Sequence, residues 1–130
     1  MISTDLALAL RDAGLVWHPA SGDRFQLDEP EFEADVYTVS EMTIEPRNYP
    51  TGVILAFNGT TEWALDSVAL EDALWLPRED QLRELLGDRL EVVRRLEGEW
   101  ELTYAVAPGY VRTVTDVDLE CAYAKAILTL

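Results

Sequence analysis

Clustered carboxylates are the residues of this sequence whose types and spacing could do chemistry. Asp116, Asp118 and Glu120 alternate along one short segment, and Ca²⁺ and Mg²⁺ are bound by clustered oxygen ligands. A calcium-binding loop would need further ligands and a glycine at its sixth position, whereas helix-forming residues follow Glu120. Carboxylates at the start of a helix cap its free N–H groups and favour its dipole. The segment therefore predicts a capped helix start, with a cation site as the alternative.

A denser acidic run lies earlier in the chain, over residues 28–35. Such a run is typical of a solvated loop, but it could also form a docking surface for a basic partner or a weak cation site. We expect a solvated loop, and we keep Glu29, Glu31 and Glu33 as residues of a candidate interaction surface. A small metal-dependent hydrolase that uses one of the two acidic clusters is the enzymatic alternative.

A single histidine and a single cysteine limit nucleophilic and zinc chemistry. His18 and Cys121 are far apart in the sequence, and a catalytic thiolate needs a neighbouring base. A zinc site of the Cys/His type needs more ligands than this pair supplies. We interpret His18 as a surface residue of a hairpin and Cys121 as a passive residue of a helix. No residue is assigned as catalytic, metal-binding or cofactor-binding, and no cofactor is expected.

The charge balance excludes several classes of partner. Ten basic residues stand against 25 acidic ones, which gives a net charge of −15, and a nucleic-acid-binding surface needs clustered Lys and Arg. Lys125 is the one lysine and lies between two alanines, so phosphate-binding loops and kinase-type lysines are excluded. Hydrophobic residues make up 48% of the chain. That fraction can build a core and argues against disorder.

Location is predicted from the same composition. No apolar stretch reaches the roughly 20 residues that span a bilayer, and the start of the chain lacks the basic residues of a signal peptide. A lone cysteine fits a reducing compartment. We therefore expect a cytoplasmic protein with no membrane partner.

Hydrophobic periodicity and turn residues predict an α+β fold in a single domain over residues 1–130. Helices are expected over residues 4–13, from Pro77 to Gly87, and from about residue 118 onward. Short strands at 15–18 and 24–27 would form a hairpin. Two sets of three strands follow, at 36–44, 53–57 and 61–65, and at 89–96, 100–106 and 110–114. The predicted order is α-ββ-βββ-α-βββ-α, with mostly antiparallel sheets and about three helices packed on them.

One apolar triplet has two interpretations. Leu74, Trp75 and Leu76 are consecutive large apolar residues just before Pro77. In an extended segment they cannot all face one way, because successive side chains point to opposite sides. The triplet is either covered on both sides as part of the core, or it exposes a contact patch such as a homodimer seam. We keep the three residues in the candidate interaction surface.

Two segments of the chain carry a family resemblance. They are FNGTTEWALDS at residues 57–67 and ALWLPREDQLRELLG at residues 73–87. Together they resemble a family of small uncharacterised bacterial proteins, some of which are labelled "pilus assembly protein". Residues 99–130 are also similar to the ββα unit of HicB-type antitoxins. The first resemblance implies a setting in pilus or secretion machinery, and neither supplies a functional residue.

Together these features predict a cytosolic protein-interaction module without catalytic activity. Its partner is expected to be another protein or a second copy of the chain. Two other classes stay open: the small metal-dependent hydrolase, and an antitoxin or immunity-type inhibitor that presents acids to a basic toxin. A small basic toxin gene next door would favour the last class.

The net charge generates a prediction about stability. Like charges on a folded surface repel, and salt screens this repulsion within a Debye length of about 10 Å at 0.1 M. We expect the melting temperature to rise from low to physiological salt, as measured by differential scanning calorimetry. A melting temperature that stays flat or falls would contradict the prediction.

Overall fold

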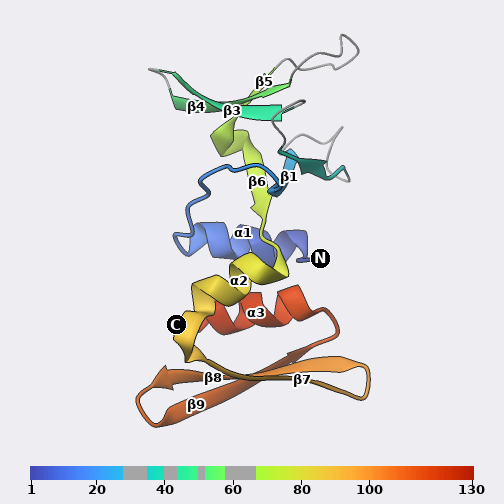
Figure 1. Ribbon diagram of the computed structural model, residues 1–130, viewed down its shortest axis with the longest axis vertical. Coiled ribbons are helices and arrows are strands. Elements are labelled where there is room, and N and C mark those ends of the chain that lie inside the picture. Colours follow the sequence, from blue (N-terminus) through green and yellow to red (C-terminus); the bar gives the residue numbers. More distant parts are fainter. Residues whose placement is uncertain (28–34, 40–43, 50–51, 58–66) are drawn as a thin grey trace. The chain divides into compact units, whose positions relative to one another are not determined.

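The computed structural model describes residues 1–27, 35–39, 44–49, 52–57 and 67–130, and it has the predicted α+β architecture (Figure 1). The helices are α1 (Thr4–Asp12), α2 (Glu79–Leu86) and α3 (Leu119–Leu128). The strands are β1 (Arg24–Leu27), β2 (Tyr37–Thr38), β3 (Ile44–Tyr49), β4 (Gly52–Phe57), β5 (Ser67–Ala69), β6 (Ala73–Leu76), β7 (Leu90–Leu96), β8 (Glu99–Ala107) and β9 (Tyr110–Asp116). The described strands pair antiparallel in three sheets of three strands each.

The chain divides into two compact units. The first contains Met1–Val16 and Pro77–Leu130, and the second contains Trp17–Leu76. The single domain expected from the sequence stays a prediction, and each unit is described here by itself.

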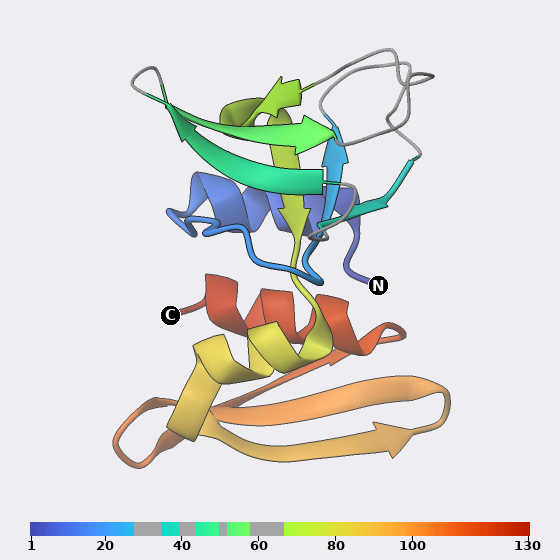
Figure 2. The same ribbon diagram turned by 45° about the horizontal axis from the view of Figure 1, so that its top comes forward.

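In the first unit, all three helices lie on one side of the β7-β8-β9 sheet (Figures 1 and 2). Helix α3 packs on β8 and β9, and α1 and α2 pack on α3. Leu102 and Tyr104 of β8 are fully buried, and the Tyr104 hydroxyl lies 2.6 Å from Oγ1 of Thr129 at the end of α3. The core of this unit therefore lies between the sheet and its helices.

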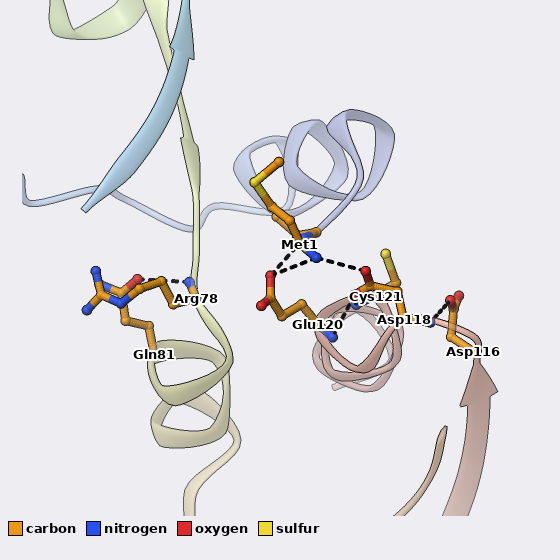
Figure 3. A network of polar contacts seen from close by, with 8 residues as sticks. Met1, Arg78, Gln81, Asp116, Asp118, Glu120 and Cys121 are labelled. Carbon is orange, nitrogen blue, oxygen red and sulfur yellow. Dashed lines mark hydrogen bonds and ion pairs between the residues drawn. The ribbon is translucent and has the colours of Figure 1, made fainter. Parts of the chain in front are cut away.

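The helix ends follow the predicted local signals. The Ser3 side chain accepts a hydrogen bond from the N–H of Leu6 at the start of α1. At the start of α2, the N–H of Arg78 donates to Oε1 of Gln81 at 3.0 Å (Figure 3). Gly87 ends α2 with a φ of 59°, a value that glycine adopts without steric cost. The helices predicted over residues 4–13, 77–87 and from 118 are confirmed within a residue or two.

The β7-β8 hairpin closes through a turn with two left-handed residues. Glu97 and Gly98 have φ values of 48° and 85°, and Leu96 pairs with Glu99 across them. Two positive φ values define the turn whose twist matches that of paired strands. The strands predicted at 89–96, 100–106 and 110–114 are confirmed as β7, β8 and β9.

The second unit holds an aromatic cluster across the β2-β1-β6 sheet. Tyr37 of β2 and Trp75 of β6 lie directly opposite Phe25 of β1. The rings of Phe25 and Tyr37 are 5.5 Å apart, and Trp17 lies 5.5 Å from Phe25 and 6.4 Å from Trp75. Leu27, Val39 and Ala73 complete the buried cluster.

The hairpin predicted between 15–18 and 24–27 is wrong. Residues 15–18 form no strand, and β1 pairs with β2 and β6 instead. Trp17 gives the physical reason, because its ring packs on Phe25 and Trp75 as part of the cluster. The strand β6 was absent from the prediction, since its three large apolar residues show no alternation.

The β3-β4-β5 sheet confirms the central strand of the predicted meander. β4 is the central strand, as expected for residues 53–57. The strand predicted at 36–44 is divided into β2 and β3, and β3 continues through Pro46. Proline fits there because β3 is an edge strand, which needs no N–H on its outer side. The turn at Asn58-Gly59 and the strand at 61–65 lie outside the described residues.

Asp23 connects the loop that precedes β1 to the aromatic cluster. Its side chain is buried, with 3% exposed, and its Oδ2 accepts from Nε1 of Trp17 at 2.9 Å and from the N–H of Ala20 at 3.0 Å. The carbonyl of Asp23 also accepts from the N–H of Val39 at 2.8 Å. One residue thus holds the loop, the indole and the segment after β2 together.

Removal of the Asp23 carboxylate should destabilise the protein. In Asp23→Ala the buried indole N–H of Trp17 loses its acceptor, and an unsatisfied buried donor costs about 1–3 kcal/mol. Asp23→Asn keeps an acceptor oxygen and should cost less. Urea unfolding curves of the two variants measure the difference. Equal losses would show that the hydrogen bond to Trp17 is not the main contribution.

Candidate functional site

Two of the three alternating carboxylates, Asp118 and Glu120, contact the start of the chain. Asp116 ends β9, Asp118 precedes α3, and Glu120 lies in its first turn. Figure 3 shows the side chains of Asp118 and Glu120 directed toward Met1. The backbone of residue 2 and the amino group of residue 1 therefore lie against the N-terminus of α3.

Asp118 has two structural roles. Its Oδ1 accepts from the N–H groups of Glu120 and Cys121 at 2.9 and 3.2 Å. Its Oδ2 accepts from the amino group of Met1 at 2.8 Å. The hydrogen bond to Asp118 raises the pKa of this amino group above 8.0, against the opposing effect of burial. The predicted helix cap is confirmed, and its second role was not visible in the sequence.

The two flanking carboxylates are also engaged. Glu120 Oε2 accepts from the N–H of Ile2 at 2.8 Å. Asp116 accepts from the N–H of Asp118 at 2.9 Å and lies 2.7 Å from Nζ of Lys125. Burial by itself would raise the pKa of Asp116, but Lys125 and the backbone donors hold it below its ordinary value.

These contacts decide what the cluster can do chemically. A cation would have to compete with the Met1 amino group and with Lys125, which already pair with the carboxylates. A general base would need a raised pKa, whereas the pKa of Asp116 is lowered. In the described part of the chain, no group of three or more His, Cys, Asp or Glu residues could hold a metal ion.

The environment of Cys121 does not favour a nucleophilic role. Cys121 is buried on α3, with 7% exposed, and burial raises its pKa above that of an ordinary thiol. A nucleophilic cysteine needs a lowered pKa. His18 belongs to the second unit and is exposed.

The apolar triplet has one residue on one side of β6 and two on the other. Leu74 and Leu76 are buried, with 5% and 0% exposed, so they belong to the interior rather than to an exposed contact patch. Trp75 lies on the other side of the strand from Leu74 and Leu76. There it is half-buried and packs on the aromatic cluster. Glu29, Glu31 and Glu33 lie outside the described residues.

The side of the β7-β8-β9 sheet that faces away from α3 is a surface that the sequence analysis did not single out. Because Leu102 and Tyr104 face α3, strand alternation turns Glu101 and Thr103 to the opposite side. The cross-strand register assigns further residues to that side. We name it the open face, and it contains Val92, Arg94, Leu96, Glu101, Thr103, Val111 and Thr113.

Large apolar side chains on and beside the open face are exposed. Val92 is 47% exposed, Leu96 43% and Val111 54%, and Tyr110 at the start of β9 is 70% exposed. Polar pairs lie between them: Arg94 Nε donates to Glu101 at 2.7 Å, and the hydroxyls of Thr103 and Thr113 are 3.2 Å apart.

A signal for this surface exists in the sequence. The strand Leu90-Glu91-Val92-Val93-Arg94-Arg95-Leu96 places apolar residues on both faces, and such a pattern suits a strand covered on both sides. The helices of the first unit cover only one of its two faces (Figure 2). A comparison of the predicted helices with the two faces of the sheet would therefore have indicated that one face stays uncovered.

Comparisons with known proteins give no family to which the chain can be assigned. No protein-family model matches the chain, and neither the curated proteins nor the solved structures contain a significant match. Among the described residues, no helix combines the length and the apolar character needed to cross a membrane.

The hydrogen bond between the Met1 amino group and Asp118 should make stability depend on pH. Because its folded-state pKa lies above 8.0, its contribution is complete below that pH and is lost as the pH rises through the folded-state value. We expect the free energy of unfolding to fall as the pH rises above about 8, the ordinary pKa of an α-amino group. Asp118→Asn retains the helix cap without the charge, so its fall should be smaller.

Two controls separate the contributions of Asp118. Asp118→Ala removes the cap as well, which costs about 1 kcal/mol or more at every pH. Burial also raises the pKa of the Cys121 thiol, and this main cause of the shift is common to all three proteins. A pH profile of Asp118→Asn that is identical to that of the wild type would contradict the assignment.

Proposed function

We propose that the protein is a non-enzymatic protein-interaction module that binds its partner through the first unit's three-stranded sheet. One observation carries the proposal: helices cover one side of β7-β8-β9, while Val92, Leu96 and Val111 are exposed on the other. Exposed large apolar side chains on one face of a sheet, with polar pairs between them, suit a surface that binds another protein.

The chemistry of the carboxylates supports contact rather than catalysis. Asp116, Asp118 and Glu120 bind groups of the protein itself, and the arrangement therefore favours a structural role. The enzymatic alternative would rest on residues 28–34, which lie outside the described part of the chain.

The arginines of β7 fit a protein partner better than a nucleic acid. Arg94 on the open face is ion-paired with Glu101. On the other side of the strand, the guanidinium of Arg95 lies 5.5 Å from the centre of the Trp100 ring. These arginines are occupied within the sheet, and the whole chain carries a net charge of −15. Phosphate backbones need free clustered cations.

The setting of this function is part of the proposal. A cytoplasmic location is supported by the buried free thiol of Cys121, and a role in pilus or secretion machinery rests on the family resemblance alone. The antitoxin or immunity-type alternative is supported by the net charge of −15, and a neighbouring gene for a small basic toxin would favour it.

Site-specific photocrosslinking in cells tests the proposed surface. A photoreactive amino acid replaces Val92 on the open face or, as a matched control, Leu85 on α2, which is 45% exposed against 47% for Val92. We expect discrete crosslinked products from position 92 and none from position 85, because only the former would lie at an interface.

The pattern of products decides the outcome. A defined protein adduct at position 92 supports the module, whether the adduct is another protein or a second copy. Equal crosslinking at the two positions, or none at either, would contradict it.

A further inference from the structure

A hollow at one end of the open face indicates which kind of partner the face binds. It lies beside the β7-β8 turn and has a volume of about 380 Å³. Its lining residues are Leu96, Glu97, Glu99, Glu101 and Thr115. Leu96 and Glu101 also belong to the open face, so the hollow is continuous with that face.

Strand alternation brings two of these carboxylates to the same side of the sheet. Glu101 lies opposite Thr115 of β9. Alternate residues of a strand face the same side, so Glu99 lies with Glu101 on the side away from α3. The register shift of the β7-β8 pair lies between Leu90 and Val92. It is therefore at the far end of the strand and does not alter this placement.

The hollow carries an excess of negative charge. Glu101 is paired with Arg94, at 2.7 Å. Glu97 and Glu99 are exposed, and neither forms an ion pair within the part of the chain that the structure describes. Two carboxylates are therefore available to a cationic group of a partner.

Glu97 occupies a position that local preference does not explain. It has a φ of 48° and is the first of the two left-handed residues of the β7-β8 turn. Asparagine, aspartate or glycine is the usual residue at such a position. Because the residue also lines the hollow, we attribute the glutamate to the chemistry of the hollow rather than to the turn.

We infer that the open face binds a basic protein and that an arginine of this partner enters the hollow. This inference rests on the proposed function and specifies the chemistry of its partner. The guanidinium donates to the carboxylates of Glu97 and Glu99, since its planar set of N–H donors matches carboxylate geometry. The aliphatic stem of the arginine packs on Leu96, and apolar residues of the partner cover Val92 and Val111.

Other occupants fit the same surface less well. A second copy of the chain brings further glutamates to a face whose Arg94 is already paired, and its net charge of −15 adds repulsion. A nucleic acid carries phosphates, which the carboxylates of the hollow repel. A small organic cation would fill the hollow but would leave Val92, Leu96 and Val111 exposed.

Titration with an arginine derivative, followed by NMR of the backbone amides, tests the hollow itself. The probe is Nα-acetyl-arginine amide, and Nα-acetyl-citrulline amide is the uncharged control of nearly the same shape. We expect the arginine compound to shift the resonances of Leu96, Glu97 and Glu99, with a Kd on the order of millimolar for a few exposed ion pairs. Equal shifts with citrulline, or shifts only at other residues, would overturn the inference.

A pair of double variants separates the hollow from the total charge. Glu97→Gln/Glu99→Gln removes the two available carboxylates and should weaken binding of the arginine compound by about fivefold or more. Glu84→Gln/Asp88→Asn is the matched control. It alters two exposed acids on and just after α2 and changes the net charge equally. At physiological salt it should change the Kd by less than about twofold, since distant charges are screened.

Circular dichroism verifies that both double variants are folded. Equal weakening by the two variants would show that the net charge, and not the hollow, attracts the arginine. That result would overturn the inference.

Photocrosslinking at position 92 tests whether a basic protein occupies the face. We expect mass spectrometry to identify an adduct with a protein in which arginine and lysine outnumber the acids. Glu97→Gln/Glu99→Gln should lower the yield of this adduct by about fivefold or more, whereas Glu84→Gln/Asp88→Asn should leave it unchanged.

The outcomes distinguish the two proposals. If the adduct contains an acidic protein or a second copy, the basic partner is overturned while the interaction module stands. A yield that Glu97→Gln/Glu99→Gln does not lower has the same meaning. If position 92 gives no product at all, both proposals fail.

Discussion

The burial of α3 is the interaction on which the first unit depends. Its residues Cys121, Ala122, Tyr123, Ala124 and Ala126 are all buried, since β8 and β9 cover the helix on one side and α1 and α2 on the other. The small alanine side chains allow these neighbours to approach closely, as interhelical distance depends on the side chains at the contact. Burial, with the carboxylate of Glu79 beside its hydroxyl, raises the pKa of Tyr123 to about 12. The tyrosine therefore stays neutral in the core.

This arrangement has a direct consequence for the sheet. Because α1 and α2 pack on α3, the three helices cover only one face of β7-β8-β9 (Figure 1). An antiparallel sheet can keep one face in water when that face is polar. Here the open face alternates ion pairs and threonines with exposed valines and leucine, a composition intermediate between a solvated face and a core. The surface proposed for partner binding thus results from the way the helices are placed.

The acidic residues have different roles in different places. At the start of α3 they neutralise an amino group and a lysine and join segments that are more than 100 residues apart in the sequence. In the second unit, Asp23 accepts hydrogen bonds from Trp17 and Ala20 within the interior. On β8, Glu101 is paired with Arg94. A net charge of −15 therefore does not describe one acidic surface, because several of these carboxylates hold the structure together.

Local signals were sufficient for much of the fold. The caps at Ser3 and Asp118, the end of α2 at Gly87 and the turn at Glu97-Gly98 act within a few residues, so the sequence alone determined the helices and the last three strands. It did not determine which distant segments pair. Residues 15–18 form no strand, and the ring of Trp17 packs in the aromatic cluster instead. β6 pairs with β1. In both cases, side-chain packing between distant segments outweighs local propensity. Tertiary structure also decided that Leu74 and Leu76 are interior and that Val92 and Val111 are exposed. It likewise brought Asp116, Asp118 and Glu120 to their cationic partners. The physical reason is that burial and ion pairing depend on neighbours that folding brings together from far along the chain.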